Sequence, residues 1–452
     1  MHDILYRRIL AINFIAISSF CQFFQSFQIT WYPLKFSKLR YTGFPSLFCN
    51  RIEELKHQRE EFMRKETIQC FLMDGLFWAI MAIFYGYSTY YLRSIGYSSA
   101  QIGIMTAIGS VLSAAIQNVL GTLNDRGGWW NWKRIFRLML GLTAGLLICM
   151  TLIRNSLIAG ILFMMAMIFG NGMMPFTVII CFEYRSNGFP VDYGKTRAGG
   201  SLFYAIAVYL IGVMTEKGGP IMVPISGIAL CIAEWIVLMT MKSSRHQQAP
   251  EKADKKVGVN EIRRRYPAFF LMTLGLVLLF AFHNGTNTYL LPILERVGGD
   301  TRSLGTAFAI SAITEVPVEI FIEKILKKIS ADKLLLISGF GFFFKGIMYL
   351  AAGSVAVIYL SQLLEIVSYA FYSGAAPYYA NERIAPGYLS GAQAMMTSCT
   401  MIGAVLGNLT SGWIYEGLGL SSMILLCIGY AAAGTLIISS SLNLERKKGA
   451  AS

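Results

Sequence analysis

The chain has 452 residues, of which 55% are hydrophobic and only 14% are charged, and its mean hydropathy is +0.53. Apolar stretches recur at the length of roughly 20 residues that a helix needs to cross a bilayer core, which excludes a large soluble enzyme and predicts a polytopic membrane protein. The formal net charge of +14 does not indicate nucleic-acid binding, because that would need a basic face clustered on a folded domain.

The first 62 residues differ in composition from the rest. They contain one glycine and nine phenylalanines, whereas the other 390 residues contain 42 glycines. The run "QREEF", directly before Met63, is what a purine-rich ribosome-binding sequence would give if it were translated. We therefore expect Met63 to be the start of a bacterial protein and residues 1–62 to be an atypical extension. A real extra helix or a signal-like anchor is the alternative.

Twelve apolar spans are predicted after Met63. They are expected to be helices, because backbone amides in lipid must find their hydrogen-bond partners within the segment. The predicted spans are 67–92, 99–122, 135–153, 156–182, 196–215, 220–241, 267–294, 303–326, 333–353, 355–380, 390–416 and 420–442.

Basic residues predict the orientation of these spans. From Arg64 onward the chain has 31 Lys and Arg residues. Lys345 lies inside a span, 25 lie on one side of the membrane or at its edge, and five lie on the other: Arg93, Arg154, Lys217, Arg296 and Arg302. Since the cytoplasmic side carries the excess of positive charge, both termini and the central loop are predicted to be cytoplasmic.

The predicted domain organisation is two six-helix bundles. A polar, charged loop at 242–266 separates an N-terminal half, 63–241, from a C-terminal half, 267–442, which a short cytoplasmic tail follows at 443–452. Two such halves are the layout of secondary transporters built from repeats. The eight cysteines lack metal-ligand or disulfide spacing. We therefore expect an all-α integral membrane protein that is no enzyme and holds no metal or cofactor.

Local motifs narrow this interpretation to a family. The loop "GTLNDRGGWWNWKR", with Gly121, Asp125 and Arg126, resembles the conformational loop of the major facilitator superfamily. Three stretches resemble the sugar–proton symporter branch around lactose permease, with its related nucleoside and phenylpropionate permeases: "YGKTRAGGSLFYAIA", "AITEVPVEIF" and "LLEIVSYAFYSGAAPYY". The resemblance covers about residues 67–442, and it implies the twelve-helix fold and transport by alternating access.

Glu315 lies near the middle of the eighth predicted span. An ionisable side chain at mid-bilayer costs roughly 2.5–3.5 kcal/mol on insertion scales, so it usually lines a cavity or has a partner. The resemblance implies that this carboxylate contacts the substrate and takes part in proton coupling; a packing carboxylate is the alternative. Glu319, one turn later, is expected to be solvated near the cytoplasmic end.

Lys345 in the ninth span and Glu365 in the tenth are expected to form a pair. The family branch has an arginine at the position of Lys345, and at the positions of Glu365 and Ser368 it has a histidine and a glutamate. The resemblance therefore implies a redrawn proton-coupling pair, because protonation of Glu365 would break it. A static buried ion pair that fixes packing is the alternative.

Further substrate contacts are carried over from the same branch. The resemblance implies that Arg197 grips substrate hydroxyls and that Tyr204, on the same helix face, stacks on a sugar ring. Val178 replaces the carboxylate that partners the arginine, which weakens a galactoside interpretation. Arg197 as a charge at the membrane edge and Tyr204 as a packing residue are the alternatives.

The seventh span offers neutral polar groups that suit hydroxyl-rich ligands. They lie in "FHNGTNTY": His283, Asn284 and Asn287. Structural roles are the alternative for all three. Tyr87, Tyr90 and Asn171 are expected to pack in the core, and lining a cavity is the alternative. No partner is evident for Asp74 or Glu234.

The function expected is a proton-coupled importer of a small polar solute, a sugar or oligosaccharide, in the bacterial cytoplasmic membrane. The proton is the coupling ion, and the chain is expected to act as a monomer whose partners are its substrate and the lipid bilayer. A nucleoside or aromatic-acid symporter of the same branch is the alternative. A drug-efflux pump fits less well, because such cavities are usually less polar.

Overall fold

The structure is a computed structural model that describes residues 65–126, 129–189, 191, 193–241 and 259–449. Within these residues the regular structure is helical throughout. The interpretation of residues 1–62 and of most of the central loop lies outside the described residues. The elements α3–α10 are Lys65–Gly86, Ser88–Ser94, Ser99–Arg126, Trp132–Leu152, Ser156–Gly172, Met174–Ser186, Tyr193–Gly218 and Met222–Thr240.

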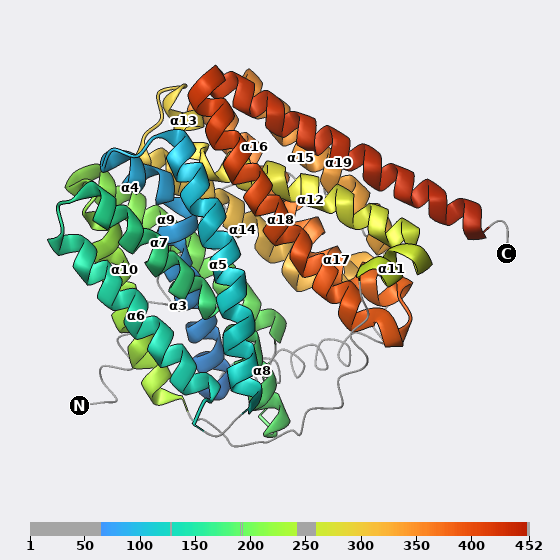
Figure 1. The fold of residues 1–452 in the computed structure, drawn as a ribbon, viewed down its shortest axis with the longest axis horizontal. Coiled ribbons are helices and arrows are strands. Elements are labelled where there is room, and N and C mark those ends of the chain that lie inside the picture. The colour runs from blue at the N-terminus through green and yellow to red at the C-terminus, as the bar shows by residue number, and fades with distance from the viewer. Residues whose placement is uncertain (1–64, 127–128, 190, 192, 242–258, 450–452) are drawn as a thin grey trace, which may run out of the picture. The chain divides into compact units, whose positions relative to one another are not determined.

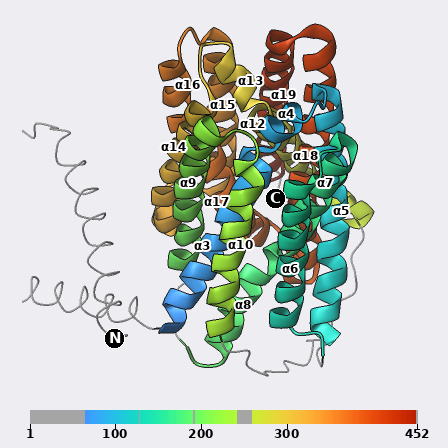
Figure 2. The same ribbon diagram turned by 90° about the vertical axis from the view of Figure 1, so that its left-hand side faces the viewer.

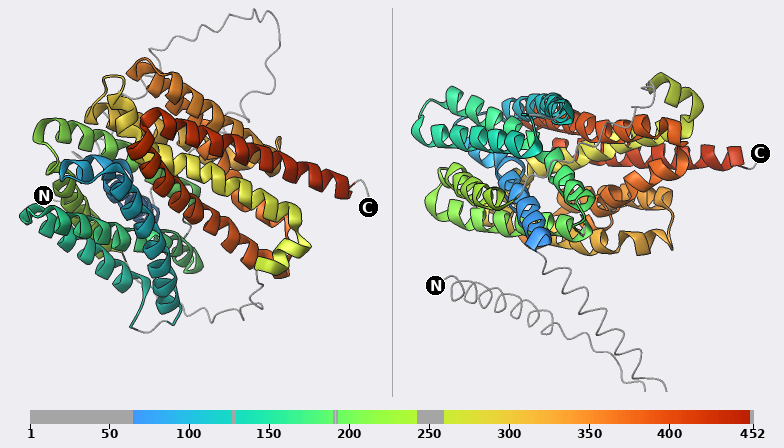
Figure 3. Two further views of the ribbon diagram at one scale, coloured as in Figure 1. Left: turned by 45° about the horizontal axis from the view of Figure 1, so that its top comes forward. Right: turned by 90° about the horizontal axis from the view of Figure 1, so that it is seen from below.

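The second half repeats this order after the short α11. The elements from α11 onward are Val259–Arg265, Pro267–Thr288 (α12), Leu290–Glu295 (α13), Thr301–Leu326 (α14), Ala331–Ala351 (α15), Val355–Gln362 (α16), the 3₁₀ turn η1 at Leu363–Ile366, Tyr369–Arg383 (α17), Pro386–Leu418 (α18) and Leu420–Gly449 (α19). Figure 1 shows α3–α10, in blue to green, gathered beside α12–α19, in yellow to red, and the further views in Figure 3 show the same two groups.

The prediction of an all-α membrane protein is confirmed. In the described ranges, eleven segments are long and apolar enough to cross a membrane. The predicted span 390–416 lies on α18, which has the length but is not one of the eleven. Polar residues that line a cavity recur along it, among them Gln393, Thr397 and Asn408. The twelfth span and the position of the termini remain predictions.

Four predicted spans are broken helices, and the breaks occupy corresponding places in the two halves. The first span breaks at Tyr87 and the seventh at Tyr289. The fourth breaks at Met173, between two glycines and a proline, and the tenth turns through η1 before α17 begins. Discontinuous helices at matching places of two repeats are typical of transporters, where irregular backbone lines a cavity.

Two helix pairs join the halves: α9 packs along α14, and α5 packs against α18, as Figure 2 shows. Glycines permit the closest approach. A Cβ at Gly212 would lie 2.8 Å from the Thr301 carbonyl oxygen, and one at Gly412 would lie 2.7 Å from the Ser99 carbonyl oxygen. Each crossing therefore brings backbone against backbone, which a larger side chain would prevent.

Tyr87 and Tyr289, the tyrosines at two of the helix breaks, form hydrogen bonds at these same two crossings. The Tyr87 hydroxyl donates to the Val208 carbonyl of α9, and the Tyr289 hydroxyl donates to the Ser99 carbonyl at 2.7 Å. Arg93 and Glu295 form an ion pair between the halves at 2.7 Å. On the predicted orientation this end of the molecule is the outer end, and it is closed.

Asp300 caps the N-terminus of α14. Its Oδ1 accepts hydrogen bonds from the backbone N–H of Ser303 at 2.7 Å and from the Ser303 hydroxyl at 2.8 Å. These bonds favour the ionised carboxylate, and the backbone bond is the main reason that the pKa of Asp300 is lowered. A lowered pKa in the folded state contributes stability above the unfolded value of 3.8, and that stability is lost as the pH falls through the folded value.

Replacing Asp300 with alanine is expected to lower the free energy of unfolding by about 1 kcal/mol at neutral pH, and by less near about pH 3. Thermal unfolding in detergent at the two pH values measures this. Asn155→Ala is the control, because the Asn155 amide caps α7 on the Ile158 N–H without a charge. An Asp300→Ala effect as independent of pH as that of Asn155→Ala would contradict the prediction.

Candidate functional site

A cavity of about 520 Å³ lies between the two halves. Both halves line it: α3, α4, α5, α7, α8 and α9 on one side, and α12, α14, η1, α17 and α18 on the other. The volume is in the range of about 300–1,000 Å³ that small-molecule sites occupy. The structure brings to this cavity all six predicted substrate contacts: Arg197, Tyr204, His283, Asn284, Asn287 and Glu315.

Lys345 and Glu365 form the predicted pair. The Lys345 ammonium donates directly to Glu365 Oε2, and the two side chains are 2% and 1% exposed. Glu365 also accepts a hydrogen bond from Ser368 at 3.4 Å. Glu365 lines the cavity, whereas Lys345 does not and lies behind it. The sequence placed Glu365 in a continuous helix; it instead lies in the 3₁₀ turn η1 at the helix break.

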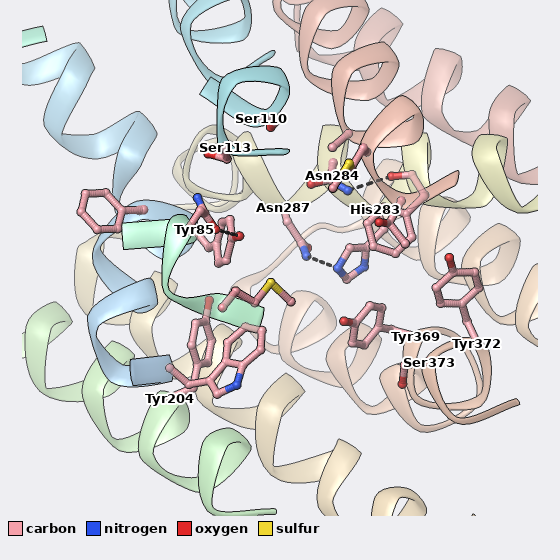
Figure 4. Close-up of a pocket in the computed structure, with 18 of the residues that line it drawn as sticks. Tyr85, Ser110, Ser113, Tyr204, His283, Asn284, Asn287, Tyr369, Tyr372 and Ser373 are labelled. Carbon is pink, nitrogen blue, oxygen red and sulfur yellow. Dashed lines mark hydrogen bonds between the residues drawn. The ribbon is translucent and has the colours of Figure 1, made fainter. Parts of the chain in front are cut away.

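His283 links this pair to the cavity. Its Nδ1 lies 3.6 Å from Glu365 Oε1, and its Nε2 lies 3.1 Å from the side-chain nitrogen of Asn287. Because an amide nitrogen only donates, the hydrogen-bond network assigns the proton of the neutral ring to Nδ1, which faces the carboxylate. The ring also stacks on Tyr369 with centroids 4.5 Å apart (Figure 4). His283 therefore connects Glu365 with Asn287 and lines the cavity as well.

Arg197 is already engaged in the structure. Its guanidinium forms an ion pair with Glu319 of α14 at 3.5 Å and lies over the ring of Trp78, 4.7 Å from the centroid. Ser201 donates to the same carboxylate at 3.2 Å. The expectation that Glu319 is a solvated bystander is therefore wrong: its side chain is 12% exposed and it joins the two halves. Glu319 lies one helical turn after Glu315, where α14 packs along α9. The sequence does not reveal that these two helices are in contact.

Glu315 also lines the cavity, but it has no partner among the described residues. Of the acidic side chains that line it, Glu365 has Lys345, whereas Glu315 makes no hydrogen bond or ion pair with any residue that the structure describes. Burying an unpaired carboxylate is costly, so such a group carries a proton or waits for a ligand donor. Glu315 is thus the side chain best placed for a ligand to satisfy.

The N-terminal half lines the cavity with neutral groups. The Tyr85 hydroxyl donates to the side-chain oxygen of Asn171 (Figure 4), and the Gln117 amide donates to the Asn171 carbonyl at 2.8 Å. Asn171 lines the cavity, which was the alternative to packing in the core. Tyr87 is buried in the core as expected, and Val178, on α8, does not line the cavity.

Sequence reasoning missed an aromatic wall. Tyr369 and Tyr372 of α17 line the cavity beside Phe280 and His283 (Figure 4). The two tyrosines are three residues apart in "SYAFYSG", which places them on one helix face. That spacing was the available signal.

The conformational loop begins at Gly121. Gly121 lies near the end of α5, and a Cβ there would meet nothing within 4 Å. Close packing therefore does not require glycine at this position. The side chains of Asp125 and Arg126 lie outside the described residues.

Comparison with known proteins agrees with the fold and the cavity, which define a transporter of the major facilitator superfamily. Residues 70–425 match the MFS_1 like family. The chain belongs to this family, and it is a multi-pass membrane protein rather than an enzyme.

A curated relative is an uncharacterized transporter, YwbF, of Bacillus subtilis (strain 168). It is 28% identical over 251 residues, or 54% of this chain. The chain spans 59% of that relative's length.

Solved structures share the fold at low identity. A mutant form of the nucleoside transporter NupG has a TM-score of 0.73 at 14% identity, covering 83% of this chain and 100% of NupG. A bacterial homologue of the human lysosomal transporter Spinster, in an inward-facing and occupied conformation, has a TM-score of 0.64 at 14% identity and covers 83% and 96%.

Proposed function

We propose that the chain is a proton-coupled importer of a small, neutral, hydroxyl-rich solute, a sugar or oligosaccharide, in the bacterial cytoplasmic membrane, and that it acts as a monomer. The observation that carries the proposal is Glu315, a carboxylate without a partner among the described residues, in a cavity where Arg197 and Glu365 are already in ion pairs. Hydroxyl groups donate well to such a carboxylate, and Asn171, Asn284 and Gln117 add neutral partners.

Proton coupling follows from the neighbourhood of Glu365. A proton on Glu365 weakens its bond to Lys345, and His283 links that carboxylate to Asn287 at the cavity surface. Solute binding and proton binding then bias the same pair of conformations, which is what coupling requires. The closed outer end and the cavity between the halves support alternating access, in which the halves rock about a central site.

A nucleoside is the second candidate substrate. The aromatic wall of His283, Tyr369 and Tyr372 offers a flat face on which a base stacks. Glu315 would then accept hydrogen bonds from the ribose hydroxyls. The resemblance to the NupG fold is consistent with this choice but shows the fold alone.

Vesicle assays separate the two substrates. Addition of the right solute to de-energised vesicles should alkalinise the medium, because protons enter with it. A response to sugars and none to nucleosides favours the first proposal, and the reverse favours the second. A solute that is transported without any pH change would overturn proton coupling.

Glu315→Gln is expected to reduce solute accumulation at least about tenfold while exchange of solute across the membrane persists. Glutamine still forms hydrogen bonds but cannot exchange a proton. Uptake and counterflow in proteoliposomes measure the two activities. Glu323→Gln is the matched control, since Glu323 lies exposed two turns further along α14. Normal accumulation by Glu315→Gln would remove Glu315 from the coupling mechanism.

A further inference from the structure

Two buried carboxyl groups in the N-terminal half take no part in the cavity chemistry. Glu234 of α10 is fully buried, and neither of its carboxyl oxygens has a hydrogen-bond partner among the described residues. Asp74 of α3 is 4% exposed, and its Oδ2 is also without one. An ionised carboxylate buried without a partner costs several kcal/mol, so these positions favour the protonated form.

The unpartnered oxygen of Asp74 is aimed at α9, beside Arg197. A Cβ placed on Gly200 would lie 2.5 Å from Trp78 Cδ1, 2.7 Å from Asp74 Oδ2 and 3.0 Å from Arg197 Nη1. Both groups therefore approach this glycine, together with the edge of the Trp78 ring. Arg197 is paired with Glu319, from the other half of the protein, and lies close enough to Asp74 to act on its carboxyl group electrostatically.

We propose that Asp74, with Glu234 behind it, is a second proton-binding site, and that its proton decides which carboxylate Arg197 pairs with. With Asp74 protonated, Arg197 turns to Glu319, and the bridge between α9 and α14 forms. When Asp74 loses its proton to water, the new anion draws Arg197 back into the N-terminal half. Glu319 then loses its partner, and the bridge weakens.

The neighbours of Asp74 make this competition local. Arg197 of α9 is its cation, and the acidic groups that act on it are Glu234 of α10 and Glu319 of α14. Its own helix contributes the Cys70 thiol, and α8 contributes the Thr177 hydroxyl and the Cys181 thiol. One cation among three carboxyl groups cannot pair with all of them at once, so a proton on one of them changes which carboxylate the cation pairs with.

The inference rests on the proposed function only in what the bound proton is for, namely coupling to transport. The test of the site itself needs no solute. Infrared difference spectra of the purified protein after a pH jump detect the carbonyl band of a protonated carboxyl group. Asp74→Asn is expected to remove a band that Glu216→Gln, an exposed control on α9, leaves in place. An unchanged spectrum in Asp74→Asn would overturn the site.

A second measurement reads the bridge itself. Spin labels on Leu202 of α9 and Phe321 of α14, both exposed, report the distance between the helices in a background without Cys149. The wild type is expected to populate a longer distance as the pH rises, and Asp74→Asn to stay at the short distance at every pH. A pH dependence like that of the wild type in Asp74→Asn would overturn the switch.

Two further variants guard against misfolding of Asp74→Asn. Gly200→Ala keeps both charged groups and places a methyl group between them, so it is expected to change the pH midpoint of the distance. Glu319→Gln is expected to abolish the distance change but to keep the infrared band. Loss of the band in Glu319→Gln would contradict the proposed site. A protein that passes these tests but accumulates no solute would leave this site intact and refute the proposed function instead.

Discussion

Replacing Lys345 with methionine is expected to destabilise the folded protein by about 3–5 kcal/mol, because it leaves Glu365 buried without its cation. The two side chains are almost completely buried and bonded to one another. Replacing both, as Lys345→Met with Glu365→Gln, is expected to recover most of that stability, since no uncompensated charge remains. The double variant should still fail to couple transport to protons.

Unfolding in detergent of the wild type, the two single variants and the double variant gives the coupling energy. The exposed pair Arg93–Glu295 is the control, with side chains 38% and 43% exposed. The same cycle there should give about 0.2–1 kcal/mol. Equal coupling energies for the two pairs, or a stable Lys345→Met protein, would show that the buried pair is not ionised in the folded state.

Valine at Gly212 or Gly412 is expected to open the outer end of the protein. Each added side chain would meet a backbone carbonyl at 2.7–2.8 Å, and a backbone oxygen cannot move aside as a flexible side chain does. Overpacking of this kind costs about 1–3 kcal/mol, which corresponds to a shift of roughly 5- to 150-fold toward the conformation that separates the halves.

The rate at which an external, membrane-impermeant thiol reagent labels a cysteine at Ser110, in the cavity lining, measures that shift. Gly145→Val is the matched control, because a Cβ at Gly145 meets nothing within 4 Å. Faster labelling in Gly212→Val or Gly412→Val than in the control is the expected result. Equal rates would mean that these crossings do not hold the outer end closed.

The predicted spans agree closely with the helices, because the length of an apolar run can be read directly from the sequence. The positions of the breaks were not predicted, since they depend on contacts between helices. α3 ends at Gly86, and the hydroxyl of the next residue, Tyr87, reaches the Val208 carbonyl of another helix. No local pattern in "IFYGYSTYY" shows that contact.

The residues of the candidate site could be predicted from the sequence, but their contacts could not. Glu315, Lys345 and Glu365 stood out because an ionisable residue in an apolar span is rare. Glu315 and Glu319 share one helix face by their spacing, but only the approach of α9 determines that Glu319 has a cation while Glu315 has none among the described residues. The role of each remains a prediction for the experiments above.

Trp78 gives the protein an optical reporter of its own. Among the tryptophans of the described ranges it alone lines the cavity, and Arg197 lies over its ring. Indole emission responds to a nearby charge and to the loss of water, so a change in the Arg197–Glu319 bridge or the arrival of a solute would alter the intrinsic fluorescence. Candidate solutes can therefore be screened on the unlabelled wild-type protein in detergent, before any transport assay is set up.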